Sequence, residues 1–163
     1  MNQNNRFPED FRSFIESLNK HGVEYLLIGG FAMGAYGYIR STGDLDIFIH
    51  ATEENAQRAL KACIDFGIDE ADLKIEMFLV EKMIGIGMPP LRIEILKKLD
   101  TIDFKYAYQR AETKSPDGLE IKIVALDDLI LLKEAAVKGR NKERDREDLA
   151  FLKQYKNKLN PGK

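Results

Sequence analysis

Two aspartates separated by a single residue are the first feature of this sequence that suggests chemistry. Asp44-Leu45-Asp46 opens the apolar segment 44–50, which predicts a β-strand. Side chains alternate between the faces of a strand, so both carboxylates point to one side while Leu45 and Ile47 point into the core. Two negative charges about 7 Å apart along a strand repel each other, and a shared divalent cation removes that repulsion. A solvated strand face explains an isolated Asp-x-Asp equally well, so the pair needs support from elsewhere in the chain.

Gly29 and Gly30 provide part of that support. They follow the apolar run 23–28 and precede the small-residue segment 31–38, an order that predicts a strand, a tight turn and a helix. A plain strand-to-helix turn would account for the glycines alone. Such a turn also presents backbone N–H groups to an anion, and glycine lets the backbone approach a phosphate closely. A phosphate cradle would then lie beside a metal site, as expected where an ion bridges phosphate oxygens and neutralises their charge.

The stretch LLIGGFAMGAYGYIRSTGDLDIFI, residues 26–49, closely resembles the signature of the nucleotidyltransferase fold in the DNA polymerase β superfamily. The resemblance is greatest to stand-alone bacterial branches that include antibiotic nucleotidyltransferases and abortive-infection toxins, and it extends from about residue 24 to about residue 152. It implies that Gly29 and Gly30 bind the triphosphate of a nucleotide. It also implies that Asp44 and Asp46 bind two Mg²⁺ ions, for which Mn²⁺ is an alternative.

The same resemblance implies a third carboxylate on a later strand beside the aspartate strand. Glu94, in the segment Arg-Ile-Glu-Ile-Leu at 92–96, is the candidate, because it is an acid between apolar neighbours. The family usually has aspartate at this place. Glutamate is one methylene longer and is still able to bind metal or to take a proton from an acceptor hydroxyl. Metal ligand, general base and plain surface acid therefore all stay open for Glu94.

Lys133 stands out through its periodicity. It is the i+7 member of a helical stripe that otherwise holds Leu126, Leu129, Ile130 and Val137. A lysine on a core-facing stripe must find a partner or extend to solvent, because an unpaired buried ammonium is costly. A triphosphate or an active-site carboxylate would serve as that partner, and the resembling families carry a lysine in a similar helix that reaches the nucleotide phosphates.

Three more residues are implied to lie near the nucleotide. Arg40 and Thr42 belong to an Arg-x-Thr-x-Asp-x-Asp pattern that the resembling families share. Arg40 either contacts phosphate or pairs with an acid to hold the loop, and we prefer the second role. The mixed-charge segment 139–148 is similar to a Lys…Arg…Asp…Asp arrangement of those families. That similarity implies that Arg140 lies near phosphate and that Asp145 or Asp148 positions the helix.

The remaining pattern predicts helices and strands in mixed order. Helices are expected at about 9–20, 31–38, 53–66, 104–110, 126–138 and 143–158, and strands at about 23–28, 44–50, 83–88, 91–96, 112–115 and 119–124. Pro89-Pro90 would join one strand pair, and Pro116-Asp117-Gly118 is typical of a hairpin turn; residues 69–82 carry no clear pattern. We expect one α/β (α+β) nucleotidyltransferase domain over 1–163. Its core at about 23–124 would hold a mixed sheet flanked by helices, largely covered by C-terminal helices at about 126–158.

Composition narrows the classes of protein and of partner. The 163 residues are 44% hydrophobic and 32% charged with a formal net charge of -2, which argues against a generally basic nucleic-acid binder. The single cysteine, Cys63, excludes an internal disulfide and suits a reducing compartment. The first residues, MNQNNRFPEDF, hold no apolar run behind a basic cluster, so we expect no secretory signal, and no run approaches the roughly 20 apolar residues of a membrane span. We therefore expect a soluble cytoplasmic protein without a membrane partner.

The resemblance implies an enzyme that transfers a nucleoside monophosphate from a nucleoside triphosphate to an acceptor and releases pyrophosphate. The acceptor stays open between a small molecule, an RNA end and a protein. The alternatives are a catalytically inactive nucleotide-binding module and a toxin with an antitoxin partner. Because the predicted core leaves no separate domain to close the site, we expect a homodimer partner, an antitoxin or a large acceptor to do so.

Overall fold

A mixed sheet forms the centre of the protein. The computed structural model describes residues 7–38, 40, 42–80, 83–88 and 91–161. Within these residues six strands are ordered β3-β4-β2-β1-β6-β5, with β4–β2 and β1–β6 parallel and the other neighbours antiparallel. The strands are β1 (Tyr25–Ile28), β2 (Asp44–Ile49), β3 (Met83–Met88), β4 (Leu91–Leu96), β5 (Glu112–Lys114) and β6 (Ile121–Ile123). The predicted mixed α/β architecture is confirmed.

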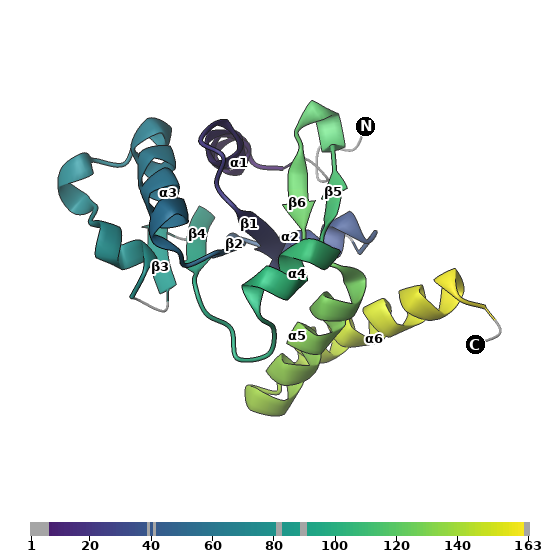
Figure 1. The fold of residues 1–163 in the computed structure, drawn as a ribbon. Helices are drawn as coiled ribbons and strands as arrows, with labels where there is room; N and C mark the ends of the chain where they lie inside the picture. Colours follow the sequence, from purple (N-terminus) through teal and green to yellow (C-terminus); the bar gives the residue numbers. More distant parts are fainter. Residues whose placement is uncertain (1–6, 39, 41, 81–82, 89–90, 162–163) are drawn as a thin grey trace.

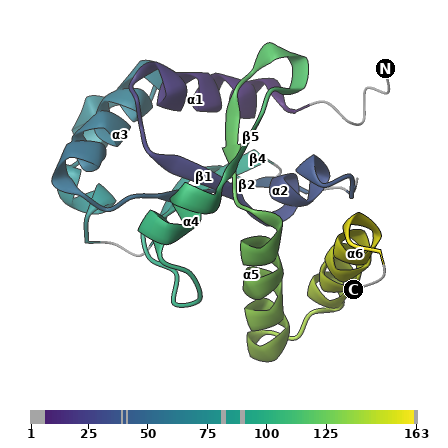
Figure 2. The same cartoon turned by 45° about the vertical axis from the view of Figure 1, so that its right-hand side comes forward.

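Helices lie on both sides of this sheet (Figure 1, Figure 2). Helices α1 and α3 pack together over one face. Helix α4 lies on the other face, where its Phe104 contacts Phe48 of β2 with ring centroids 5.2 Å apart. The short α2 follows β1 directly. The helices are α1 (Glu9–Lys20), α2 (Gly29–Ala35), α3 (Glu53–Phe66), α4 (Phe104–Arg110), α5 (Leu126–Gly139) and α6 (Glu143–Leu159). None of the described helices is long and apolar enough to span a bilayer.

Most predicted elements are present, and the differences have local causes. Strand β1 begins at Tyr25 rather than at Val23, because the backbone N–H of Glu24 donates to the Asn55 side chain at 2.7 Å. The helix expected at 31–38 begins at Gly29 and ends at Ala35. The unassigned region contains two 3₁₀ turns, Glu70–Asp72 and Ile75–Phe78. Pro89 and Pro90, which were expected to join two strands, lie outside the described residues.

The expectation that both C-terminal helices largely cover the sheet is wrong for α6. This helix packs on α5 and on the segment after α2, where Tyr38 contacts Phe151 with ring centroids 4.6 Å apart. Figure 2 shows α5 and α6 as a pair that extends away from the sheet. Leu152 is buried, whereas Leu159, near the free end of α6, is 57% exposed. Tyr38 and Arg40, which follow α2, therefore both contact α6, and this brings residues of α6 toward the start of β2.

Candidate active site

The pairing of β2 with β4 brings two of the predicted carboxylates together. The strands run parallel with Asp46 opposite Glu94, so these residues share one face of the sheet. Leu45 and Ile47 are fully buried on the opposite face, as the alternation predicted. Asp44 lies two residues before Asp46 on the same face as Asp46. The structure thus gathers Asp44, Asp46 and Glu94 at one end of two central strands.

Asp46 is in an environment that disfavours its negative charge. Burial raises its pKa to about 7, and a hydrogen bond to Glu94, the charge of Glu94 and the charge of Asp44 act in the same direction. The ammonium of Lys133 lowers this pKa, by less than the other effects raise it. A carboxyl group held between two further acids and away from water is therefore a place where an added cation is favoured.

Glu94 has a second neighbour that the sequence analysis did not single out. Arg92, two residues earlier on β4, places its Nε 3.3 Å from Glu94 Oε1. Its guanidinium lies over Gly85 of β3, where a Cβ atom would collide with it. The i, i+2 spacing was the available signal, since it puts Arg92 and Glu94 on the same strand face.

The carboxylates fit Mg²⁺ in one particular way. Among the described residues no group of three or more acidic, histidine or cysteine side chains is arranged to hold a metal ion by itself. Mg²⁺, however, is usually bound through one or two carboxylates together with phosphate oxygens of the substrate. The adjacent Asp46 and Glu94, with Asp44 beside them, suit that mode, in which the nucleotide supplies the remaining ligands.

Gly29 and Gly30 are held against the same carboxylate strand. Gly29 has φ 74°, a conformation that favours glycine, and a Cβ atom there would collide with the Asp46 carboxylate. A Cβ on Gly30 would lie 2.7 Å from Thr42 Oγ1. Neighbouring side chains thus leave no room for a Cβ atom at either glycine. The two glycines let the backbone of the turn lie next to Asp46, the predicted metal ligand.

A cluster of ion pairs around two buried aspartates lies near these acids. Arg40 binds Asp148 through two hydrogen bonds of 2.9 and 2.8 Å, and Lys133 Nζ lies 2.7 Å from the same carboxylate. Arg140 binds Asp145 through hydrogen bonds of 2.6 and 2.8 Å, which lower the pKa of Asp145. We call these five residues the cation cluster, since three positive and two negative side chains leave one net positive charge.

The cation cluster contains three residues that were predicted to lie near the nucleotide: Lys133, Arg40 and Arg140. Lys133 is buried and paired with Asp148, so it does not extend to solvent, and its predicted contact with a triphosphate stays a prediction. Arg40 pairs with an acid that holds its loop. Arg140 remains 58% exposed and, with Lys133, interacts electrostatically with Asp46. The cluster can therefore present positive charge to an anion that is bound at the carboxylates.

Comparison with known proteins identifies the family. The family described as nucleotidyl transferase of unknown function (DUF2204) matches residues 8–161. The chain belongs to this nucleotidyltransferase family. No curated protein matches it.

Two solved structures share the fold. An antigenic nucleotidyltransferase-like protein from Paracoccidioides brasiliensis aligns over 86% of this chain and 72% of its own, with 15% identity and a TM-score of 0.51. A putative nucleotidyltransferase from Thermotoga maritima aligns over 90% of both chains, with 15% identity and a TM-score of 0.50. These likenesses establish the nucleotidyltransferase fold.

The raised pKa of Asp46 predicts a pH-dependent effect of removing its charge. Between its ordinary pKa of 3.8 and about 7, the folded state keeps the proton that the unfolded chain loses, so wild-type stability falls as pH rises. Asp46→Asn has no charge to lose. Its free energy of unfolding, relative to wild type, should therefore increase by about 2–3 kcal/mol from pH 5 to pH 8. Urea denaturation in EDTA-containing buffers measures this, and a difference that stays constant with pH would contradict the electrostatic account.

Proposed function

We propose that this protein transfers a nucleoside monophosphate from a nucleoside triphosphate to an acceptor hydroxyl or phosphate and releases pyrophosphate. The observation that carries the proposal is the Asp46–Glu94 pair on adjacent parallel strands, with the Gly29–Gly30 turn packed against Asp46. Membership of a nucleotidyl transferase family supports the class of reaction. In the reaction an acceptor oxygen forms a bond to the α-phosphorus, and the bond from that phosphorus to the bridging oxygen of the β-phosphate breaks.

The acidic residues of the site would bind the metal ions. Asp44, Asp46 and Glu94 would hold Mg²⁺, or Mn²⁺ in its place, and a bound ion would neutralise phosphate charge and polarise the phosphorus–oxygen bonds. We assign two ions to this site, by resemblance to the family. Glu94 is also the proposed acceptor of the proton that the attacking hydroxyl loses.

The positive and backbone groups would hold the triphosphate. Gly29 and Gly30 offer N–H groups at the turn next to Asp46, and Thr42 lies beside Gly30. Lys133 and Arg140 already interact electrostatically with Asp46, which supports a role for them with phosphates bound there. Arg40 would act from the adjoining loop, where Asp148 holds it.

Closure of the site is part of the proposal. A second copy of this chain, an antitoxin or the acceptor itself would exclude water, because an open site favours hydrolysis of the triphosphate over transfer. The cytoplasm is the proposed location.

Labelled nucleotides test the reaction directly. With each NTP, Mg²⁺ or Mn²⁺, and total RNA or a small-molecule panel, label in the α-phosphate should move to an acceptor and label in the γ-phosphate should appear in pyrophosphate. Asp44→Asn and Asp46→Asn should lose this transfer by about 100-fold or more, since each removes a metal ligand. Asp100→Asn, at an exposed acid, is the matched control.

Three outcomes would contradict the proposal in different ways. Label moving from the γ-position indicates phosphoryl rather than nucleotidyl transfer. Nucleotide binding without any labelled product favours the inactive nucleotide-binding or toxin–antitoxin module. Near-normal transfer by Asp46→Asn would mean that the site is assigned to the wrong residues.

The variant Lys133→Met tests whether Lys133 binds phosphate or only stabilises the fold. Asp148 keeps Arg40 and Asp145 keeps Arg140, so each buried acid retains a partner and the variant should fold. NTP affinity should fall by about 1.5–3 kcal/mol, the scale of a charge-assisted hydrogen bond. Titration calorimetry should show an unchanged NTP affinity for the control variant Lys138→Met, at an exposed position of the same helix. Equal affinity of Lys133→Met and wild type would remove Lys133 from the nucleotide site.

A further inference from the structure

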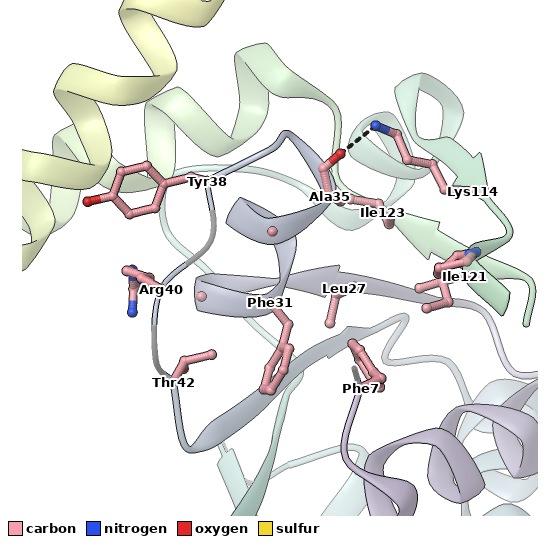
Figure 3. Close-up of a pocket in the computed structure, with 13 residues that line it drawn as sticks. Phe7, Leu27, Phe31, Ala35, Tyr38, Arg40, Thr42, Lys114, Ile121 and Ile123 are labelled. Carbon is pink, nitrogen blue, oxygen red and sulfur yellow. Dashed lines mark hydrogen bonds between the residues drawn. The ribbon is translucent and has the colours of Figure 1, made fainter. Parts of the chain in front are cut away.

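The structure contains a cavity that lies apart from the carboxylates. It has a volume of about 540 Å³, within the range of about 300–1,000 Å³ that is typical of small-molecule sites. Its walls come from α2, from the β5–β6 hairpin and from Phe7, which precedes α1. Figure 3 shows Phe7, Phe31 and Ile121 around this hollow, with Lys114 at its upper edge. We call it the α2 cavity.

The register of the sheet puts the α2 cavity on the face opposite the carboxylates. Leu27, which lines the cavity, is opposite Ile47 of β2 and Ile123 of β6. Asp46 is opposite Ile28, the next residue along β1, and so points to the other side. Gly30 and Thr42 contribute to the cavity wall, which makes the turn a partition between the two sites.

The lining is mainly apolar and partly aromatic. Phe7 and Phe31 have ring centroids 4.8 Å apart, and the rings of Phe31 and Phe11 are nearly perpendicular with centroids 5.3 Å apart. Both Phe7 and Phe31 keep part of their surface exposed, so ring surface remains free to contact a ligand. Gly34 is exposed in the cavity wall, and no atom lies within 4 Å of the position that a Cβ would take. This surface suits a planar apolar group, which packs well on aromatic rings.

The charge of the lining is of one sign. Lys114 and Arg40 line the cavity, and its described lining residues include no acid; Asp148 matches the charge of Arg40, so Lys114 is the cation that faces a ligand. Lys114 Nζ donates to the carbonyl of Ala35 at 2.7 Å and lies 4.7 Å from the centre of the Tyr36 ring (Figure 3). Glu112 is 4.0 Å away, beyond hydrogen-bond distance, so N–H donors of this ammonium remain for another acceptor.

We propose that the α2 cavity binds a planar aromatic small molecule that carries an anionic group. The ring lies against Phe31 and the apolar side chains of β6, and the anion faces Lys114. The cavity shares Gly30, Arg40 and Thr42 with the proposed triphosphate site, but Leu27 in its wall points to the face of the sheet opposite Asp46, so we propose a ligand other than the nucleotide. The inference does not depend on the proposed transferase activity.

Two fluorescent probes test the site in the intact protein. 1-Anilinonaphthalene-8-sulfonate has two aromatic groups and one sulfonate, and it should bind with one molecule per chain. Gly34→Leu places an apolar side chain in the cavity and should weaken this binding by about tenfold or more. Gly139→Leu, at an exposed helical glycine that also has open space around it, should leave the affinity unchanged. Circular dichroism and the thermal midpoint verify that both variants fold.

A neutral analogue tests the role of charge. Lys114→Met should weaken binding of the sulfonate by about three- to tenfold, the loss of a single charge-assisted contact, and leave binding of neutral N-phenyl-1-naphthylamine unchanged. Asp46→Asn should bind both probes like wild type. Non-saturable binding by wild type, equal sulfonate affinity of Gly34→Leu and wild type, or loss of binding in Asp46→Asn would each overturn the proposal.

Discussion

The parallel pairing of β2 with β4 is the contact on which the candidate active site depends. It sets Asp46 opposite Glu94, so that two carboxylates meet on one face of a sheet whose other face is the apolar core. Burying an acid beside other acids is unfavourable, and it raises the pKa of Asp46 to about 7. A bound cation would stabilise this folded state, because the cation interacts with the folded arrangement of acids and not with the unfolded chain.

The cation cluster links this strand pair to the C-terminal helices. Asp148 of α6 is completely buried and binds both Arg40, from the loop after α2, and Lys133, from α5. A buried acid with two partners from different elements restricts how those elements can sit relative to each other. Helix α6, which packs on α5, therefore supplies the carboxylates that hold the positive side chains near Asp46.

Local pattern was sufficient for much of this arrangement. The alternation around Asp44 and Asp46 predicted a strand with both acids on one face, and the helical stripe predicted that Lys133 is core-facing and needs a partner. These inferences hold because strand and helix periods depend only on local geometry. The family resemblance added that a strand with a third acid runs beside the pair, which residue spacing alone does not contain.

Long-range packing was the part that local pattern could not supply. Asp148 as the partner of Lys133 depends on how α6 returns along α5, and that angle is set by contacts such as Tyr38 on Phe151. Leu159 follows the apolar spacing of its helix and is nevertheless exposed, because the sheet does not extend beneath it. Arg92 was detectable from its i, i+2 relation to Glu94, but its contact with that acid required the glycine at position 85 on the neighbouring strand.

The central claim is that Asp46 and its neighbours bind a nucleotide together with a divalent metal. Isothermal titration calorimetry with the four α,β-methylene nucleoside triphosphates, which cannot undergo the transfer, measures this binding without any acceptor. We predict that at least one analogue binds wild type only when Mg²⁺ or Mn²⁺ is present, and that Asp46→Asn weakens this binding by about tenfold or more while Asp100→Asn does not. Metal-independent binding, or equal affinity of Asp46→Asn and wild type, would contradict the account.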